Sequence, residues 1–142
     1  MARWLIDTDV LIDVALNRQP HAGPSGSAID LLQLREGESL FVAWHTVSNL
    51  YYNAYDLRRP RDTAFARATV SGLLEYAEIA PTSTDDLHYA LTLAIPDFED
   101  AMQVAAARAC DAQFILTRNV RDYVASPIPA LTPAGAIAEL SP

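Results

Sequence analysis

Short apolar runs alternate along the chain with longer segments in which apolar residues recur at helical spacing. The runs lie at 4–6, 40–43, 77–80 and 114–117, each short enough for a buried strand. Periodicity and capping residues predict helices at 10–17, 46–57, 62–74, 83–93 and 97–110, with a last short helix ending near residue 140. Strands that alternate with one or two helices favour a mainly parallel sheet covered on both faces, so the predicted fold class is α/β.

Two segments rich in proline, glycine and serine interrupt this pattern. Residues 18–27 are predicted to form a loop, from which Ser25 or Ser27 caps a helix that runs to about residue 35, where Gly37 stops it. The segment 126–133, which holds three prolines, is predicted to lead into the last helix.

The length and the single cysteine limit the class of protein. A chain of 142 residues without a repeat or linker suits one domain over 1–142. Cys110 alone cannot form an internal disulfide or a thiolate zinc site, which fits a reducing compartment such as the cytoplasm. Asp7 interrupts the first apolar run, so we expect no export signal, and no apolar stretch is long enough to span a membrane.

The charged residues exclude several chemistries. The chain has ten basic residues, all arginine, against 18 acidic ones, a formal charge of −8. Without lysine it can form neither a Walker-type phosphate loop nor a Schiff base. A phosphotransfer enzyme or receiver domain, which Asp7 and Asp9 after an apolar strand would suggest, is disfavoured because such proteins balance the aspartyl phosphate with a lysine.

Acidic and polar side chains follow two of the predicted strands. Asp7 comes directly after the first strand, and Thr117, Asn119 and Asp122 follow the strand at 114–117. The carboxyl ends of parallel strands meet at one edge of the sheet, where binding sites form. Asp100 opens the helix before that second strand, and its helix end can point into the same crevice.

Carboxylates gathered at one edge would repel one another. Two of them about 5 Å apart at an effective dielectric constant of about 20 repel by roughly 3 kcal/mol, and three make three such pairs. A bound divalent cation relieves this repulsion. Oxygen ligands without paired cysteine or histidine favour Mg²⁺ or Mn²⁺, which can activate water for attack on a phosphodiester.

Each of these acids also has a purely structural explanation. Asp7 can cap the helix that follows it, and Asp97 with Asp100 fits an N-cap and third-residue pair favoured by the helix dipole. Asn119 and Asp122 lie where an ordinary polar turn is expected.

Three segments together resemble the PIN-domain ribonucleases, including the VapC-type toxins of bacterial toxin–antitoxin pairs. Residues 5–13 are similar to the opening motif, with Asp9 in place of the usual asparagine, and 97–103 resemble the central motif, whose metal-binding acid aligns with Asp100. Residues 117–123 resemble the Thr-Arg-Asn-x-x-Asp-Phe motif, with Tyr123 in place of phenylalanine. The resemblance runs along the whole chain.

The resemblance implies a three-layer α/β/α fold with a mainly parallel sheet of four or five strands, and a metal-dependent endoribonuclease. It implies that Asp7 and Asp100 hold the catalytic Mg²⁺ or Mn²⁺, and that Asp122 and Asn119 hold a second ion or its waters. Thr117 would orient the attacking water or a phosphate. For a toxin, the implied partners are an RNA substrate, a second copy in a homodimer and a cognate antitoxin.

One position departs from the family pattern. Most catalytic members carry a glutamate in the helix after the second strand, whereas Asn49 stands there in this chain. An amide oxygen can still coordinate Mg²⁺ but brings no charge, so we expect a weaker metal site. The alternative function is therefore a PIN scaffold that binds RNA or protein with weak or no catalysis.

Contact with RNA must be local, because a chain of net charge −8 lacks the general phosphate affinity of a basic protein. Arg118, Arg121 and Asn119 lie in the proposed site loop and are predicted to grip phosphates. A second basic group either binds phosphates or is a solvated helix end that complements the dipole. It comprises Arg58, Arg59, Arg61 and Arg67.

Overall fold

The computed structural model describes residues 1–57 and 60–141, and its centre is a five-stranded parallel sheet. The strands are β1 (Arg3–Ile6), β2 (Ser39–Val42), β3 (Glu78–Ile79), β4 (Phe114–Leu116) and β5 (Ala130–Leu131). Their spatial order is β3-β2-β1-β4-β5, which places β1 in the middle. Trp4 pairs with Leu40 on one side and with Phe114 on the other.

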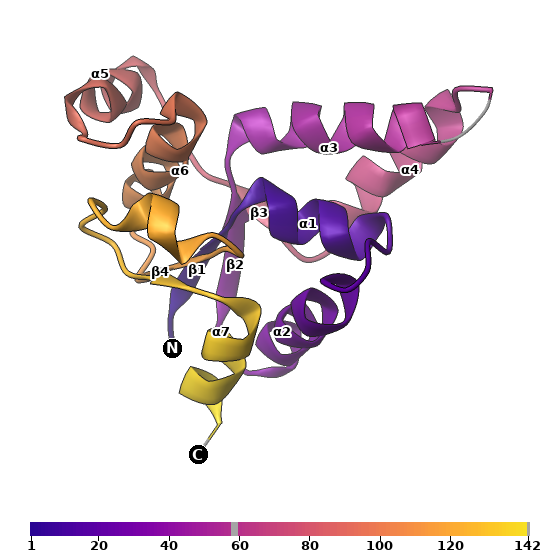
Figure 1. Ribbon diagram of the computed structural model, residues 1–142, viewed down its shortest axis with the longest axis horizontal. Coiled ribbons are helices and arrows are strands. Elements are labelled where there is room, and N and C mark those ends of the chain that lie inside the picture. The colour runs from indigo at the N-terminus through magenta and orange to yellow at the C-terminus, as the bar shows by residue number, and fades with distance from the viewer. Residues whose placement is uncertain (58–59, 142) are drawn as a thin grey trace.

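Helices cover both faces of this sheet (Figure 1). They are α1 (Thr8–Ala15), α2 (Ala22–Leu34), α3 (Trp44–Leu57), α4 (Thr63–Leu73), α5 (Thr84–Thr92), α6 (Phe98–Ala109) and α7 (Pro133–Leu140), with a 3₁₀ helix η1 (Val120–Tyr123) after β4. The three-layer α/β/α prediction is thereby confirmed. In Figure 1 the helix pair α3 and α4 extends away from the sheet as an arm.

The alternation of side chains along each strand divides the core in two. Trp4 and Ile6 point to the face covered by α1, α2 and α7, whereas Leu5 points to the face covered by α5 and α6. On the second face α6 presents a run of alanines, small enough for the helix to lie close to the sheet. Burial on both faces explains why the strands read as continuous apolar runs.

Two predicted loops contain regular structure. Helix α2 begins at Ala22, inside the segment predicted to be a loop, with Gly23 and Pro24 in its first turn. Proline is tolerated there because first-turn amides have no intrahelical partner. Ala130–Leu131 form the edge strand β5 within the proline-rich segment, a strand that the sequence pattern did not indicate. The carbonyl of Pro129 accepts from Ile115 N at 2.9 Å. An edge strand needs amides on one side only.

Other boundaries agree more closely with the pattern. Asp62 caps α4 through Phe65 N at 3.0 Å, and Gly37 adopts φ 88° in the turn before β2. Among the described residues, every helix is too short or too polar to cross a bilayer.

The sheet order creates a crevice at the carboxyl ends of β1 and β4. The chain runs outward from β1 through β2 to β3, then crosses back to β4 on the other side of β1. Connections therefore leave β1 and β4 in opposite directions, the arrangement in which parallel sheets open a binding crevice. Asp7 N donates to Leu116 O at 2.9 Å, so the residues that follow the two strands start side by side.

Candidate active site

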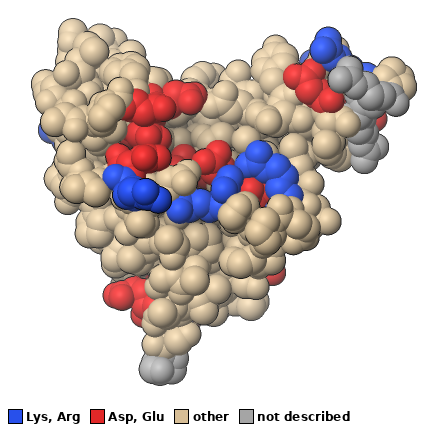
Figure 2. All heavy atoms as spheres, viewed as in Figure 1, with Lys and Arg blue, Asp and Glu red and all other residues tan. Residues whose placement is uncertain are grey.

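A cleft of about 350 Å³ lies in this crevice and is lined almost entirely by polar side chains. Figure 2 shows acidic side chains gathered in a hollow of the surface, with basic ones along one edge. The acids that line the cleft are Asp7, Asp9, Asp97, Glu99, Asp100 and Asp122. Among its other lining residues are Asn49, Asn53, Gln103 and Asn119.

Asp7 is both a helix cap and a wall of the cleft. It is the N-cap of α1, where Thr8 N donates to its Oδ1 at 2.7 Å, as the structural explanation predicted. Its side chain is also only 7% exposed, and its Oδ2 accepts from Thr117 Oγ1 at 2.8 Å. Burial raises the pKa of Asp7, and the hydrogen bond from Thr117 partly opposes that rise.

Asp100 lies in the first turn of α6, opposite Asp7. Asp97 caps this helix by accepting from Glu99 N at 2.8 Å and Asp100 N at 3.3 Å. Burial raises the pKa of Asp100 to about 6, and the negative charges of Asp97, Asp7 and Asp122 add to the rise. Asp7, Asp100 and Asp122, three aspartates far apart in the sequence, all line this one cleft.

Two buried polar side chains connect these acids. The hydroxyl of Tyr123 lies 3.1 Å from Asp7 Oδ2 and 3.3 Å from Asp100 Oδ1, and burial between two carboxylates raises the pKa of Tyr123, which keeps it a donor. Gln103 Nε2 lies 3.3 Å from Asp7 Oδ1 and 3.1 Å from both Thr8 Oγ1 and Thr46 Oγ1. Tyr123 thus helps to fix the carboxylates of Asp7 and Asp100, and Gln103 helps to fix that of Asp7.

The other predicted site residues take different positions. Asp122, on η1, is exposed and lines the cleft. Asn119 donates through Nδ2 to Asp9 Oδ2 at 3.1 Å, and Asn49 donates through Nδ2 to Glu99 Oε1 at 3.0 Å. Thr117 is fully buried beneath Asp7 and does not line the cleft.

The arginines predicted to bind phosphate differ in how they are paired. Arg118 Nε lies 2.7 Å from Oδ2 of the buried Asp13, so its guanidinium already faces a carboxylate. Arg121 is exposed on η1 and has no ion pair in the described part of the chain. Arg61 pairs with Asp56 at 3.0 Å, outside the cleft.

One further member of that second basic group, Arg67, lies within the described residues. It is exposed on α4 and does not line the cleft. Arg58 and Arg59 lie outside the described residues.

The oxygen atoms that line the cleft suit a hard cation as ligands. Gln103 is 2% exposed, and its Oε1 has no hydrogen-bond partner among the described residues, which leaves a buried oxygen acceptor beside the carboxylates. Carboxylate and amide oxygens are what Mg²⁺ and Mn²⁺ prefer. Within residues 1–57 and 60–141 no three acids, histidines or cysteines are already grouped tightly enough to hold one ion. Binding an ion would therefore require the side chains to draw together.

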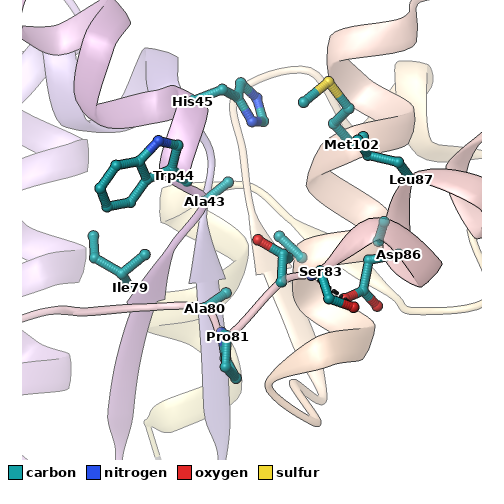
Figure 3. Close-up of a pocket in the computed structure, with 13 residues that line it drawn as sticks. Ala43, Trp44, His45, Ile79, Ala80, Pro81, Ser83, Asp86, Leu87 and Met102 are labelled. Carbon is teal, nitrogen blue, oxygen red and sulfur yellow. Dashed lines mark hydrogen bonds between the residues drawn. The ribbon is translucent and has the colours of Figure 1, made fainter.

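A larger cleft of about 530 Å³ lies elsewhere and has a different character (Figure 3). Alanines, Trp44, Ile79 and Met102 make most of its lining. Its one acid, Asp86, is engaged in capping α5, where Ser83 N donates to its Oδ2 at 2.8 Å. Burial lowers the pKa of His45 at one end of this cleft. Its chemistry is that of an apolar surface.

Sequence reasoning missed the roles of Tyr123, Gln103 and Glu99. Two signals point to the first two. Tyr123 adds a hydroxyl where the resembling motif has phenylalanine, and a buried hydroxyl needs a partner. Gln103 is a polar residue three positions after Asp100 on a face otherwise made of alanine and valine. No pattern in the sequence identifies the contact of Glu99 with Asn49.

Comparisons with known proteins give a family and a fold. The family model described as PIN domain matches residues 3–121. VapBC2 from Rickettsia felis, bound to a DNA fragment from its promoter, is similar with a TM-score of 0.71 at 14% identity, covering 92% of this chain and 98% of that one.

Two further solved structures give the same result. VapBC-1 from nontypeable Haemophilus influenzae has a TM-score of 0.68 at 14% identity, with 93% and 98% of the two chains covered. A toxin–antitoxin complex from Klebsiella pneumoniae has a TM-score of 0.66 at 20% identity, with 91% and 96% covered. Among curated protein sequences, none matches significantly.

Proposed function

Because this chain belongs to the PIN-domain family, we propose that it is a metal-dependent endoribonuclease and the toxin of a toxin–antitoxin pair. The observation that carries the proposal is the single cleft in which Asp7, Asp100 and Asp122 meet, with Asp100 at a pKa raised to about 6 by burial and neighbouring acids. Carboxylates that line one cleft favour a cation because it removes their mutual repulsion.

In this proposal the acids have separate tasks. Asp7 and Asp100 hold the catalytic Mg²⁺ or Mn²⁺, with Asp122 and Asn119 at the outer edge of the cleft holding a second ion or its waters. When bound, the ion would polarise a phosphoryl oxygen and activate water for in-line attack. Thr117, whose hydroxyl donates to Asp7 at 2.8 Å, acts as a positioning residue that orients the carboxylate.

RNA contact is proposed at the edge formed by η1 and the loop before it. Arg121 is exposed and unpaired in the described part of the chain, so it can turn towards a phosphate. Arg118 Nη2 lies 4.0 Å from Oδ2 of Asp9, which lines the cleft, while its Nε lies 2.7 Å from Asp13 Oδ2. Asn119 adds an amide that can bond to a phosphate or to a base.

The proposed partners follow from the same assignment. The solved structures similar in fold include toxin–antitoxin complexes, which supports an antitoxin as partner. We further propose a homodimer, and a cytoplasmic location where RNA is accessible. Light scattering of the purified chain, alone and with the product of the neighbouring reading frame, tests both associations.

The second candidate function is a PIN scaffold that binds RNA or protein without cutting it. Asn49 favours this candidate because a neutral amide stands where most catalytic members have an acid. Binding of RNA without cleavage, unchanged by Mn²⁺, would support it over the nuclease.

Purified protein is expected to cleave end-labelled RNA internally in the presence of Mg²⁺ or Mn²⁺, and EDTA is expected to abolish cleavage. The physical reason is that a cation relieves the repulsion among the acids that line the cleft and would supply an activated water for the attack. Gel analysis of the products, with and without chelator and after metal restoration, checks this. Cleavage that persists in EDTA would contradict the proposal.

Metal affinity is expected to fall as the pH drops through about 6. The carboxyl of Asp100 takes up a proton near its pKa of about 6, and a protonated acid is a poor ligand. Isothermal titration of the metal-free protein with Mn²⁺ at pH 7.5 and 5.5 should show much weaker binding at the lower pH. The Asp100→Asn variant should show weak binding at both.

The free energy of unfolding of the metal-free protein, unlike its metal affinity, should be higher at low pH. Because the folded-state pKa of Asp100 lies above the ordinary aspartate value of 3.8, folding takes up protons, and the stabilisation present at low pH is lost as the pH rises through about 6. After allowance for partial exposure this amounts to roughly 1–2 kcal/mol. Asp100→Asn should therefore raise the melting temperature of the metal-free protein at pH 7.5.

A further inference from the structure

The wall of the acidic cleft formed by α3 carries an amide in contact with an acid from α6. Asn49 Nδ2 donates to Glu99 Oε1 at 3.0 Å, and both residues line the cleft. The residues are 50 positions apart, so this contact exists only because the two helices face each other. The Asn49 amide therefore holds the Glu99 carboxylate beside position 49, where the chain itself has no acid.

Glu99 has one carboxylate oxygen engaged by Asn49, and it also acts electrostatically on His45. Its backbone N–H donates to the cap residue Asp97 at 2.8 Å, which fixes its position in the first turn of α6. Within the described part of the chain, Oε2 has no hydrogen bond and the side chain has no arginine partner. Glu99 therefore adds a carboxylate to the wall of the cleft that Asp7 and Asp100 also line.

A second observation points to a ligand at the same place. Gln103 lies four positions after Glu99 on α6, hence on the same face of the helix. It is 2% exposed and lines the same cleft, yet its Oε1 has no partner among the described residues. A buried oxygen acceptor without a donor is costly unless a water molecule or a cation satisfies it, and beside these carboxylates the water of a bound cation can do so.

We propose that Glu99 is the fourth carboxylate of the cation site, in place of the acid that position 49 lacks, and that Asn49 is the positioning residue that holds it. This inference rests on the proposed function. Asp7, which follows β1, and Glu99 and Asp100 in the first turn of α6 would then hold the cation, and Gln103 Oε1 would accept from its water. The charge of the site is conserved although the acid comes from a different helix.

A purely structural role for Glu99 makes different predictions. An acid in the first turn of a helix is favoured by the helix dipole whether or not a cation binds nearby. In that case removal of its charge would lower the stability of the fold slightly and leave cation affinity unchanged. The two roles are therefore separated by measuring the binding of metal and not only the activity of the enzyme.

The test is a titration of the metal-free, full-length protein with Mn²⁺, in which electron paramagnetic resonance measures the free ion at each step. Glu99→Gln keeps the size of the side chain and its bond to Asn49 but removes the charge, and we expect affinity to fall about 10- to 100-fold. Glu139→Gln is the matched control, because it removes the same charge from an exposed position on α7, and should bind Mn²⁺ like the unchanged protein. Equal affinity of the two variants would overturn the proposal.

A rescue experiment tests the exchange of acid between helices. Asn49→Glu in the Glu99→Gln background is expected to restore most of the lost affinity, because it returns the charge from the opposite wall. Asn49→Ala alone should weaken binding less than Glu99→Gln, since it removes only the hydrogen bond that positions the acid. Failure of the double variant to recover any affinity would show that the charge is not interchangeable across the cleft, against the proposal.

Asp100→Asn separates this inference from the function beneath it. If Asp100→Asn loses Mn²⁺ binding and Glu99→Gln does not, Glu99 lies outside the site and the proposed nuclease stands. If the unchanged protein binds no Mn²⁺, the proposed function and the role of Glu99 both fail.

Discussion

Replacement of Asp7 by asparagine is expected to reduce cation-dependent RNA cleavage by about 10³-fold or more. One unit of charge at about 4 Å and an effective dielectric constant of about 20 is worth roughly 4 kcal/mol to a neighbouring unit charge. That energy corresponds to about 10³ in rate if the interaction is needed in the transition state. A gel-based cleavage assay under single-turnover conditions measures the effect.

The fold should survive this change. Asparagine has the size of aspartate, and its Oδ1 can still accept from Thr8 N, which caps α1 at 2.7 Å in the present structure. The hydroxyls of Thr117 and Tyr123 can reverse and accept from the new amide, because a hydroxyl is both donor and acceptor. Since burial raises the pKa of Asp7, removal of its charge should leave the metal-free protein as stable as before, or more so.

Asp9→Asn is the matched control for this prediction. It removes one charge from the same cleft, but asparagine is the usual residue of the resembling motif there. We expect the Asp9 variant to keep most of its cleavage. If Asp7→Asn cleaved RNA as fast as Asp9→Asn, Asp7 would have no part in catalysis.

Asp13→Asn is expected to lower the free energy of unfolding by about 3 kcal/mol. Asp13 is completely buried at the end of α1, and it lies 3.1 Å from Arg18 Nη2 and 2.7 Å from Arg118 Nε. Without its charge the two guanidinium groups face each other across a neutral side chain. Both arginines reach solvent in part, so the loss should fall at the lower end of the range for buried pairs.

Thermal or urea denaturation measures this loss, which for a domain of this size should lower the melting temperature by roughly 6–12 °C. Glu36→Gln removes an exposed charge that has no ion pair among the described residues, and should change stability by less than about 0.5 kcal/mol. Arg118→Met in the Asp13→Asn background should recover part of the loss, because it removes one of the unpaired charges. A melting temperature of Asp13→Asn equal to that of the control would show that the pair contributes nothing.

The Asp13 contacts also show where prediction from the sequence stops. Arg118 lies directly before Asn119 in the site loop, and its place in that loop suggested contact with phosphate. The structure turns its Nε towards Asp13, 105 positions earlier in the chain. An arginine in a loop has acids within reach on several sides, and only the packing of α1 against that loop decides which one it pairs with.

The hydrophobic pattern predicted four of the five strands and most helices, because apolar periodicity is a local property. It missed β5, which has two residues and lies beside proline, since a strand so short has no period of its own. It also placed the start of α2 too late, because Gly23 and Pro24 are typical of a loop. In the structure Ala28 and Ile29 pack in the core, and this packing stabilises a helix that begins at Ala22.

By itself the sequence determined the α/β class and the acids that stand at the ends of β1 and β4. The succession of strands and helices along the chain, and the residue that follows each strand, can be read from the local pattern. Only the tertiary structure decided what surrounds those acids: the hydroxyl of Tyr123 shared by Asp7 and Asp100, the unsatisfied oxygen of Gln103, and the bond from Asn49 to Glu99. The reason is that desolvation and Coulomb interaction depend on distances across the fold, and no spacing along the chain contains those distances.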